Sequence, residues 1–386
     1  MAGFVRPQRR IFTAEHDSFR AAVRDFFRAE GSPRVEQWSV DGIIDRDFWK
    51  KAAAQGLVGF AAPEGLGGLG IDDFRFSCIV DEEVVYAGLG TDAFTLTNDI
   101  VGPYLWDLMS PAQQERWVPG VTDGSVVPAI AMSEPAAGSD LRGMKTTATL
   151  DGDDYVLNGS KTFITSGIQA DLVVVAAKVI RTDSDPRIGL FVVEADRPGF
   201  SKGRKLEKIG RRAQDTAELF FDQVRVPADH VVGDVDNGFA LMMRNLPQER
   251  LSIAVTAVAN AEYVLEMTVG YAQERTAFGK AIGNFQANRF AIAEMATEIR
   301  AGRAYVDDCI MRHVEGELSA AEAAGAKYWA TELEWRVVDR CLQLHGGYGY
   351  MDEYEIATRW RDARVQRIYG GTNEIMKEIV GRDLGL

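Results

Sequence analysis

The chain has 386 residues, of which 46% are hydrophobic and 26% are charged, and its formal net charge is −14. This length and ordinary globular composition predict roughly two or three domains. The negative charge argues against binding to nucleic acid, which requires basic residues to neutralise phosphates. The longest apolar runs, such as 172–177, are much shorter than the ~20 residues that a membrane-spanning helix needs.

Cysteine and histidine usage indicates neither disulfides nor a metal site. The three cysteines, Cys78, Cys309 and Cys341, lie far apart, and the four histidines are also scattered. A reducing compartment such as the cytoplasm fits this pattern. The first ten residues are basic but lead into no apolar segment, which argues against a secretory signal. A mitochondrial transit peptide stays open as the alternative to a cytoplasmic location.

The first part of the chain, residues 1–124, is predicted to be helical. Apolar residues recur there at helical spacing, as at Phe19, Val23 and Phe26. Within this region, residues 65–70 match the dinucleotide-binding pattern G-x-G-x-x-G. That pattern requires a preceding strand in a βαβ unit, and none is predicted here. We therefore interpret the segment as a loop between helices rather than a nicotinamide site.

The middle part, residues 125–235, is predicted to be a β domain. It contains short β-branched and aromatic runs, and Asp151-Gly152 and Asn158-Gly159 are dipeptides typical of hairpin turns. The segment 197–212 is strongly basic, with Glu207 as its single acid. Two interpretations of it stay open: a solvated surface, or contact with a phosphate-rich ligand.

The last part, residues 236–386, returns to long helical patterns. The order of helices, strands and helices predicts an α+β chain rather than alternating βαβ units. Two glycine-rich segments, 342–350 and 367–374, interrupt the C-terminal helices, and the second leads into a helix start. Glycine lets backbone approach a ligand closely, and a helix N-terminus offers free N–H groups to polar or anionic groups. These two segments are therefore candidates for ligand binding.

The two glycine-rich segments, together with 131–140 and 275–280, resemble the flavin-dependent acyl-CoA dehydrogenase family, and the resemblance extends from about Phe60 to the C-terminus. It implies an N-terminal α-helical domain, a middle β-barrel-like domain and a C-terminal four-helix-bundle-like domain, divided near 124 and 235. It also implies FAD as cofactor, an acyl-CoA substrate and electron-transfer flavoprotein as a partner. Family members form homotetramers, dimers of dimers, in which a neighbouring subunit completes each flavin site.

The resemblance implies contacts to the flavin ring from two segments of the β domain. The expected residues are Met132, Ser133, Phe163, Ile164 and Thr165. On spacing alone, the segment 131–140 would be a polar hairpin loop, but in the family it contacts the ring. Phe163 replaces the Trp of many members, which retains ring stacking but lacks the indole N–H donor. Ser139 is expected to touch the coenzyme A part of the substrate.

The rest of the cofactor is expected to lie against the C-terminal domain. Arg275, at the end of a long helix, matches a family arginine that reaches the pyrophosphate, for which a guanidinium suits bidentate binding. A favourable interaction of its charge with the helix dipole is the alternative. The other residues that the resemblance assigns to the cofactor are Phe278, Gln286, Gln343, His345, Gly346, Gly347, Thr372, Asn373 and Glu374.

The implied reaction is the α,β-dehydrogenation of an acyl thioester, which needs a carboxylate near the substrate Cα. Many family members carry that carboxylate between Tyr369 and Gly371, where this chain has Gly370. A minority, the long-chain and isovaleryl types, place a glutamate on an earlier helix, and Glu249 matches that position. We therefore expect Glu249 to be the base.

The residues around Glu249 support this role without the resemblance. Its helical neighbours three and four positions away are not cationic, adjacent Arg250 is not expected to face it, and Pro247 is expected to disturb the helix. Apolar surroundings raise the pKa of a carboxyl group, which suits a base in a dry pocket. An unpaired glutamate on a helix surface is the alternative interpretation.

Four residues are expected to contact the substrate around its thioester. The backbone N–H of Gly370, flanked by Tyr369 and Gly371, is predicted to donate to the thioester carbonyl. Arg250 is expected to orient the substrate, with a structural ion pair as the alternative.

The segments 247–251, 344–351 and 369–378 look most like the long-chain type. The alternatives are an isovaleryl-type enzyme, an oxygen-reacting oxidase or monooxygenase on the same fold, and a non-catalytic flavoprotein.

Overall fold

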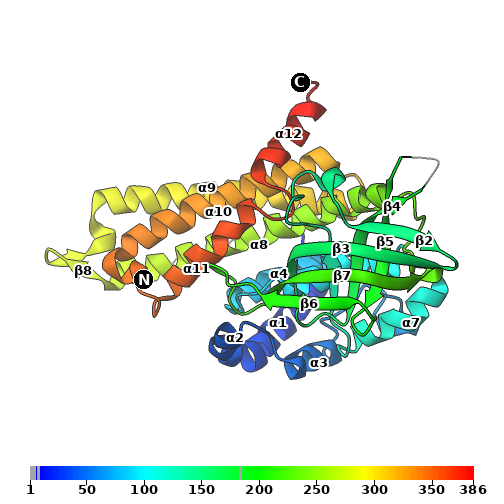
Figure 1. Ribbon diagram of the computed structural model, residues 1–386. Helices are drawn as coiled ribbons and strands as arrows, with labels where there is room; N and C mark the ends of the chain where they lie inside the picture. The colour runs from blue at the N-terminus through cyan, green and yellow to red at the C-terminus, as the bar shows by residue number, and fades with distance from the viewer. Residues whose placement is uncertain (1–5, 7–8, 182–184) are drawn as a thin grey trace.

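The computed structural model describes residues 6, 9–181 and 185–386, and it is built from helices, then strands, then helices (Figure 1). The order predicted from the sequence is therefore confirmed. The N-terminal helices are α1 (Ala14–Phe26), α2 (Val35–Asp41), α3 (Arg46–Ala54), α4 (Phe74–Tyr86), α5 (Ala93–Thr95), α6 (Gly102–Trp106) and α7 (Pro111–Thr122). Two π-helical segments, η1 (Phe27–Gly31) and η4 (Leu96–Val101), extend α1 and join α5 to α6.

The middle of the chain forms one curled, mixed sheet. Its strands are β1 (Pro128–Ala131), β2 (Thr147–Asp151), β3 (Asp154–Thr165), β4 (Leu172–Ile180), β5 (Arg187–Glu194), β6 (Phe200–Lys205) and β7 (Thr216–Pro227). Their order is β1-β4-β2-β3-β7-β6, with β5 also paired to β4. The pairs β1–β4 and β2–β4 are parallel, and the other pairs are antiparallel.

One of the two predicted hairpin turns is present and the other is not. Asp151 pairs with Asp154, so Gly152 lies in a tight turn between β2 and β3. The prediction of a turn at Asn158-Gly159 is wrong, because β3 continues through it as an irregularity in its pairing with β7. Gly159 has φ +151°, and a Cβ there would lie 2.5 Å from Thr146 Oγ1. The glycine is therefore required by a bulge and a close approach rather than by a turn.

The C-terminal part is a bundle of long helices. Its helices are α8 (Gly238–Glu274), α9 (Gln286–Val314), α10 (Ala320–His345), α11 (Glu355–Ala363) and α12 (Asn373–Asp383). Helices α8, α9 and α10 run side by side, α11 packs along them, and α12 projects away (Figure 1). A small hairpin of β8 (Thr276–Ala277) and β9 (Lys280–Ala281) forms the tip of the bundle, away from the sheet.

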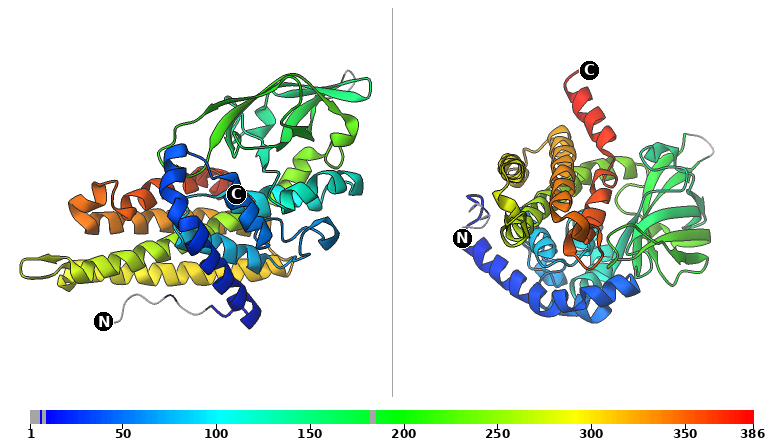
Figure 2. Two further views of the ribbon diagram at one scale, coloured as in Figure 1. Left: turned by 90° about the horizontal axis from the view of Figure 1, so that it is seen from below. Right: turned by 90° about the vertical axis from the view of Figure 1, so that its left-hand side faces the viewer.

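The sheet lies on one side of the bundle and the N-terminal helices lie along another (Figure 2). A shared hydrophobic core connects the parts, because Tyr104 of α6, Val174 of β4 and Met242 of α8 belong to one buried cluster. The first turns of α8 therefore pack directly against both other regions. The division of the chain into domains at 124 and 235 stays a prediction.

The glycine-rich segment 65–70 lies in a loop between α3 and α4, with a short 3-10 turn at Glu64–Leu66 and no strand before it. Its interpretation as a loop between helices is confirmed. Among the described residues, no helix is long and apolar enough to cross a membrane. Within the same part of the chain, His, Cys, Asp and Glu side chains form no group of three or more that could hold a metal ion.

The basic segment 197–212 mainly makes contacts within the chain. Arg197 pairs with Glu194 at 2.8 Å, and Lys202 Nζ donates to the Ile168 carbonyl at 2.9 Å. Other basic side chains of the segment bond to the carbonyls of Asp41 and Gln214 and to the carboxylate of Asp92. Several of these contacts link the sheet to the helices. They therefore favour neither a purely solvated surface nor a site that binds a phosphate-rich ligand.

Candidate active site

Glu249 lies in the early turns of α8 and is buried, with 6% of its surface exposed. Its Oε1 is 3.4 Å from the hydroxyl of Tyr104. Burial raises the pKa of Glu249 to about 7, while the charge of Arg250 and the bond from Tyr104 oppose the rise. A carboxyl group with a pKa near neutral pH suits a general base.

One expectation about the surroundings of Glu249 is wrong, and the other stays a prediction. Arg250 is not expected to face Glu249, and its charge lowers the pKa of Glu249 without a side-chain hydrogen bond between the two residues. The expectation that Pro247 disturbs the helix is wrong, because α8 continues unbroken from Gly238 to Glu274. A proline removes one hydrogen-bond donor, and packing of α8 against both neighbouring regions compensates for that loss.

The loop before α12 brings Gly370 against the helix that carries Glu249. Gly370 has φ +63°, and a Cβ there would lie 2.4 Å from Cδ1 of Ile253, one turn after Glu249. Arg250 Nε donates to the Gly370 carbonyl at 3.5 Å. The structure therefore brings together the helix turn that carries the predicted base and the predicted backbone donor.

Buried polar contacts fix the residues on both sides of Gly370. Lys327 of α10, which is fully buried, donates to the Gly371 carbonyl at 2.8 Å and to Asn373 Oδ1 at 3.0 Å. The Thr372 hydroxyl caps α12 by accepting from the Ile375 N–H. The Asn373 side chain is thus committed to α10, whereas Glu374 is exposed.

Tyr369 points away from the loop into a buried polar junction. Its hydroxyl is 3.2 Å from Asp92 Oδ2 and 2.9 Å from Gln366 Oε1. Its phenol is therefore occupied within the chain, and its backbone N–H donates to the Val365 carbonyl at 3.1 Å.

The two segments expected at the flavin ring lie side by side at the ends of β1 and β3. The Thr162 N–H donates to the Ser133 carbonyl at 2.9 Å. Buried Lys161 donates to the Met132 carbonyl at 3.0 Å and to Glu134 Oε1 at 2.9 Å. This buried ion pair fixes the two segments relative to each other.

The side chains at the end of β3 differ in their exposure. Phe163 has φ +61° and is 70% exposed, whereas Ile164 is buried in the core of the sheet. Thr165 is half-buried, and Ser139 is exposed in the loop before a short turn at Leu141–Gly143. An exposed aromatic residue in a left-handed conformation is unfavourable in an isolated chain, which indicates contact with a ligand or partner. Ile164 can offer a ligand only its backbone.

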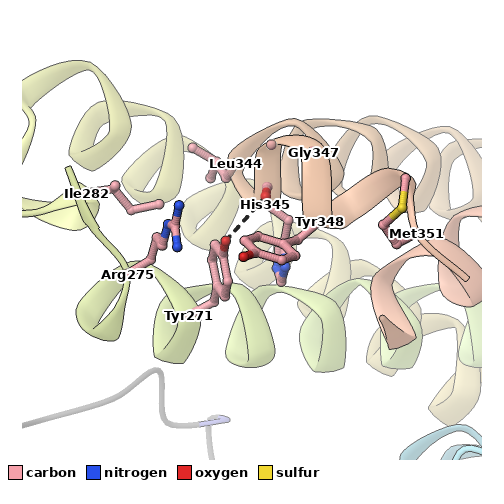
Figure 3. Close-up of a pocket in the computed structure, with 9 residues that line it drawn as sticks. Tyr271, Arg275, Ile282, Leu344, His345, Gly347, Tyr348 and Met351 are labelled. Atoms are coloured by element: carbon pink, nitrogen blue, oxygen red, sulfur yellow. Dashed lines mark hydrogen bonds between the residues drawn. The ribbon is translucent and has the colours of Figure 1, made fainter. Parts of the chain in front are cut away.

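The residues expected at the far end of the cofactor line a pocket at the tip of the bundle (Figure 3). Its volume is about 540 Å³, and its lining residues are Tyr271, Arg275, Ile282, Leu344, His345, Gly346, Gly347, Tyr348 and Met351. The guanidinium of Arg275 lies 5.3 Å from the ring centroid of Tyr348. Tyr271 stacks on His345 and donates to its carbonyl at 3.3 Å.

Three more predicted residues are exposed near this tip. Phe278, 96% exposed with φ +51°, lies in the β8–β9 turn. Gln286 begins α9 and Gln343 lies in the last turn of α10, and both are exposed. Their exposure leaves them available for contacts with a cofactor or another subunit.

One chain does not gather all of these residues around one point. Glu249 and Arg275 are 26 residues apart on α8 (275 − 249), which at 1.5 Å per residue is about 39 Å. Lys327, which holds the loop before α12, and Gln343 are 16 residues apart on α10 (343 − 327), or about 24 Å. The tip pocket is therefore separate from both Glu249 and the start of α12, which lie near each other through the Gly370 loop.

The chain matches three family descriptions along almost its whole length. They are Acyl-CoA dehydrogenase, N-terminal domain (residues 13–125), middle domain (129–224) and C-terminal domain (236–385). A curated relative, the mitochondrial long-chain specific acyl-CoA dehydrogenase of Sus scrofa, is 48% identical over 378 residues, covering 97% of this chain and 88% of the relative.

Solved structures agree with these matches. The acyl-CoA dehydrogenase of Geobacillus kaustophilus is 47% identical and superposes with a TM-score of 0.95, covering 98% of this chain and all of the other. A glutaryl-CoA dehydrogenase of Mycobacterium smegmatis, solved in complex with FADH2, is 26% identical with a TM-score of 0.89, covering 97% and 95% of the two chains. The chain belongs to the acyl-CoA dehydrogenase family of oxidoreductases.

The sequence did not reveal three residues that organise the site. Tyr104 reads as an ordinary core aromatic residue, and nothing near it in the sequence predicts its contact with Glu249, 145 positions away. Lys327 left a weak signal, because it follows the small apolar run 323–326, whereas the polar neighbours of Lys161 give none. A buried lysine needs a partner, so its occurrence in a core pattern points to a polar contact.

Proposed function

We propose that this protein is an FAD-dependent acyl-CoA dehydrogenase that oxidises long-chain acyl-CoA thioesters to trans-2-enoyl-CoA and passes the electrons to electron-transfer flavoprotein. The observation that carries the proposal is Glu249, a buried carboxyl group with a pKa of about 7, placed against the Gly370 loop. FAD, when bound, supplies the acceptor for the hydride that leaves the substrate Cβ.

Glu249 removes the proton from Cα. Its burial excludes water, and its pKa near 7 makes the carboxylate a stronger base than an exposed glutamate. The Gly370 N–H donates to the thioester oxygen and stabilises the negative charge that develops there as the proton leaves. Arg250 and Lys327 hold the carbonyls of Gly370 and Gly371, so this donor keeps its direction throughout the reaction.

The residues fit FAD at both ends. Phe163 offers an exposed aromatic face at the sheet, and Arg275 offers a guanidinium for phosphate at the tip pocket. At Gly346 and Gly347, no atom lies within 4 Å of where a Cβ would be, so backbone and a ligand can approach each other closely. The ~39 Å along α8 between Glu249 and Arg275 supports a shared site, in which Arg275 serves the flavin of a neighbouring subunit of a tetramer.

The preference for long chains rests on the identity with the long-chain specific relative and on the position of the base. Branched short-chain substrates, as in the isovaleryl type, are the alternative that the position of Glu249 also allows. We also propose a cytoplasmic location for the protein.

The purified yellow protein should be titrated anaerobically with acyl-CoAs of graded length while the bleaching of the flavin absorption is recorded. Long straight chains should bleach the flavin at the lowest concentrations. A preference for isovaleryl-CoA would replace the long-chain assignment, and an absence of bleaching with every thioester would contradict the proposed activity.

The electron acceptor needs a separate experiment. Reduced protein with bound product should reoxidise slowly in air and quickly with electron-transfer flavoprotein. Rapid reoxidation in air, with the formation of hydrogen peroxide, would identify an oxygen-reacting oxidase.

A further inference from the structure

We propose that Tyr104 is a positioning residue for the catalytic base: its hydroxyl donates to Glu249 Oε1, fixes the direction of the carboxylate and stabilises its charged form. The inference rests on the proposed function, in which Glu249 removes the α-proton. It assigns part of the control of the base to the N-terminal region, from which Tyr104 comes.

Local structure delivers Tyr104 to this place. It lies in α6, which follows the π-helical segment η4, and its ring is fully buried in the core shared by all three regions. A Cβ at Gly102 would lie 1.9 Å from the ring of Trp106, so only glycine allows the close turn that starts α6. A buried phenol needs a hydrogen-bond partner. The Tyr104 hydroxyl lies 3.4 Å from Glu249 Oε1, and Asn245, one turn earlier on α8, also interacts with it.

The direction of the hydrogen bond follows from the two groups. Burial and the nearby charge of Glu249 raise the pKa of Tyr104 well above its ordinary value, so the phenol keeps its proton and donates. A carboxylate can only accept. With Oε1 engaged, Oε2 is the oxygen left to face the substrate Cα. A bond of this kind lengthens in the free protein and shortens when a substrate closes the site.

Other titratable groups surround Glu249, but they act on it from greater distance. Arg250 on α8 lowers the pKa of Glu249 through its charge alone. Asp99 of η4 accepts from Ser252, one turn along α8, and hydrogen-bonds with buried Asp81 of α4. Burial raises the pKa of Asp99 to about 6. On α10, the pKa of Lys327 is lowered to about 7, mainly by burial and then by Arg250. Among the described side chains, only that of Tyr104 forms a hydrogen bond to the Glu249 carboxylate.

The test is the pH dependence of flavin reduction in Tyr104→Phe, measured by anaerobic stopped flow with a saturating acyl-CoA. Phenylalanine keeps the ring in the core and removes only the hydroxyl. The midpoint of the ascending limb should move to higher pH by roughly half to one unit, the shift expected from the loss of one hydrogen bond to a charged form. The rate deficit, about 3- to 10-fold below the midpoint, should disappear at high pH.

Tyr86→Phe is the matched control. It removes a buried hydroxyl that donates to Glu262 at 2.9 Å, 13 residues after Glu249 on α8, and the midpoint should stay that of the parent protein. FAD content and thermal unfolding should be measured for both variants. A loss in Tyr104→Phe that is equal at every pH, or a midpoint unchanged from the parent, would overturn the inference.

Glu249→Gln separates this inference from the proposed function. If Glu249→Gln reduces its flavin normally, Glu249 is not the base and this inference fails with that assignment, while the proposed dehydrogenase activity stands; the activity itself fails only if no acyl-CoA reduces the flavin of the parent protein. If Glu249→Gln is inactive but the midpoint of Tyr104→Phe does not move, only the role of Tyr104 is overturned. A limb with a midpoint near 6 that is unaffected by Tyr104→Phe belongs to Asp99 rather than to the base.

Discussion

The hydroxyl of Tyr369 lies 3.2 Å from the carboxylate of Asp92, so the residue directly before Gly370 is tied to the N-terminal helical region. Asp92 in turn pairs with Arg211 of the β domain at 2.9 Å. The Arg211 backbone N–H donates to Asp362 at the end of α11. All three regions of the chain therefore meet directly behind the proposed substrate-carbonyl donor.

Tyr369→Phe should remove one hydrogen bond from this junction and keep the aromatic ring in place. Loss of the hydroxyl leaves Asp92 paired with Arg211 alone, and we expect the free energy of unfolding to fall by about 1–2 kcal/mol. The rate of flavin reduction should fall several-fold because the Gly370 N–H becomes less well oriented. Denaturant unfolding and stopped flow would measure the two effects. Tyr350→Phe, at an 83% exposed position, should change neither quantity.

Glu249→Gln should bind FAD and acyl-CoA but reduce its flavin about 10²–10⁴-fold more slowly, the usual range for loss of a general base. Single-turnover reduction measured beside flavin content would check this. Glu266→Gln, at an exposed position on the same helix, should behave like the parent protein. Near-normal reduction by Glu249→Gln would mean that another group removes the proton.

The pH dependence of the parent protein should report the raised pKa of Glu249. The base acts as the carboxylate, so kcat/KM should rise with pH and level off above about 7. Between pH 4.5 and about 7, Glu249 stays protonated in the folded protein, whereas in the unfolded chain, where its pKa is 4.5, it has lost the proton. The contribution of this group to stability is therefore complete below about 4.5 and is lost as pH rises towards 7. In Glu249→Gln, both the ascending limb and this loss should disappear.

Moving the base to position 370 should fail unless space is made for it. In Gly370→Glu with Glu249→Gly, the new Cβ would meet Ile253 Cδ1 at 2.4 Å, on a backbone with φ +63°. We therefore expect little activity above Glu249→Gly alone. Adding Ile253→Val removes the clashing methyl group and should recover part of the rate, limited by the strain of a positive φ. Equal rates for the double and triple variants, with full FAD content, would show that the two positions do not converge on one substrate carbon.

Arg275→Ala should purify with less FAD and form a weaker oligomer, because its guanidinium is proposed to bind phosphate across a subunit boundary. Flavin absorption per chain and light scattering would measure both effects. Lys280→Ala removes a positive charge from the hairpin that directly follows Arg275 and should leave both unchanged. A fully yellow and stable oligomer of Arg275→Ala would favour a simple interaction with the dipole of α8.

The order of the elements was predictable because helical and strand periodicity are local properties of the sequence. The α8 helix shows the limit of local reasoning, since Pro247 predicts a disturbance that packing of the surrounding turns overrides. Asn158-Gly159 shows the same limit in the sheet. The dipeptide favours a turn, but β7 pairs with β3 on both sides of it, and that pairing is decided by residues more than 50 positions away.

The candidate site could be predicted where a motif carries it and not where it depends on contacts between distant segments. Glu249 and Gly370 could be identified from their positions in recognisable segments. Tyr104 and Lys327 could not, because their roles come from contacts with residues 145 and 44 positions away. The packing of the sheet and the bundle brings these distant residues into contact, and the periodicity of the sequence does not predict such contacts.

The uninterrupted course of α8 has a consequence for the proposed assembly as a whole. In the proposed assembly, one helix would carry the base of its own catalytic centre in its first third and, at its C-terminal end, the phosphate-binding arginine of its neighbour's centre. A chain that lacks Glu249 and a chain that lacks Arg275 would therefore combine into a pair with one fully equipped centre and one that is doubly deficient. Two inactive variants would therefore restore activity to each other when they assemble together, because α8 is long enough to reach two catalytic centres.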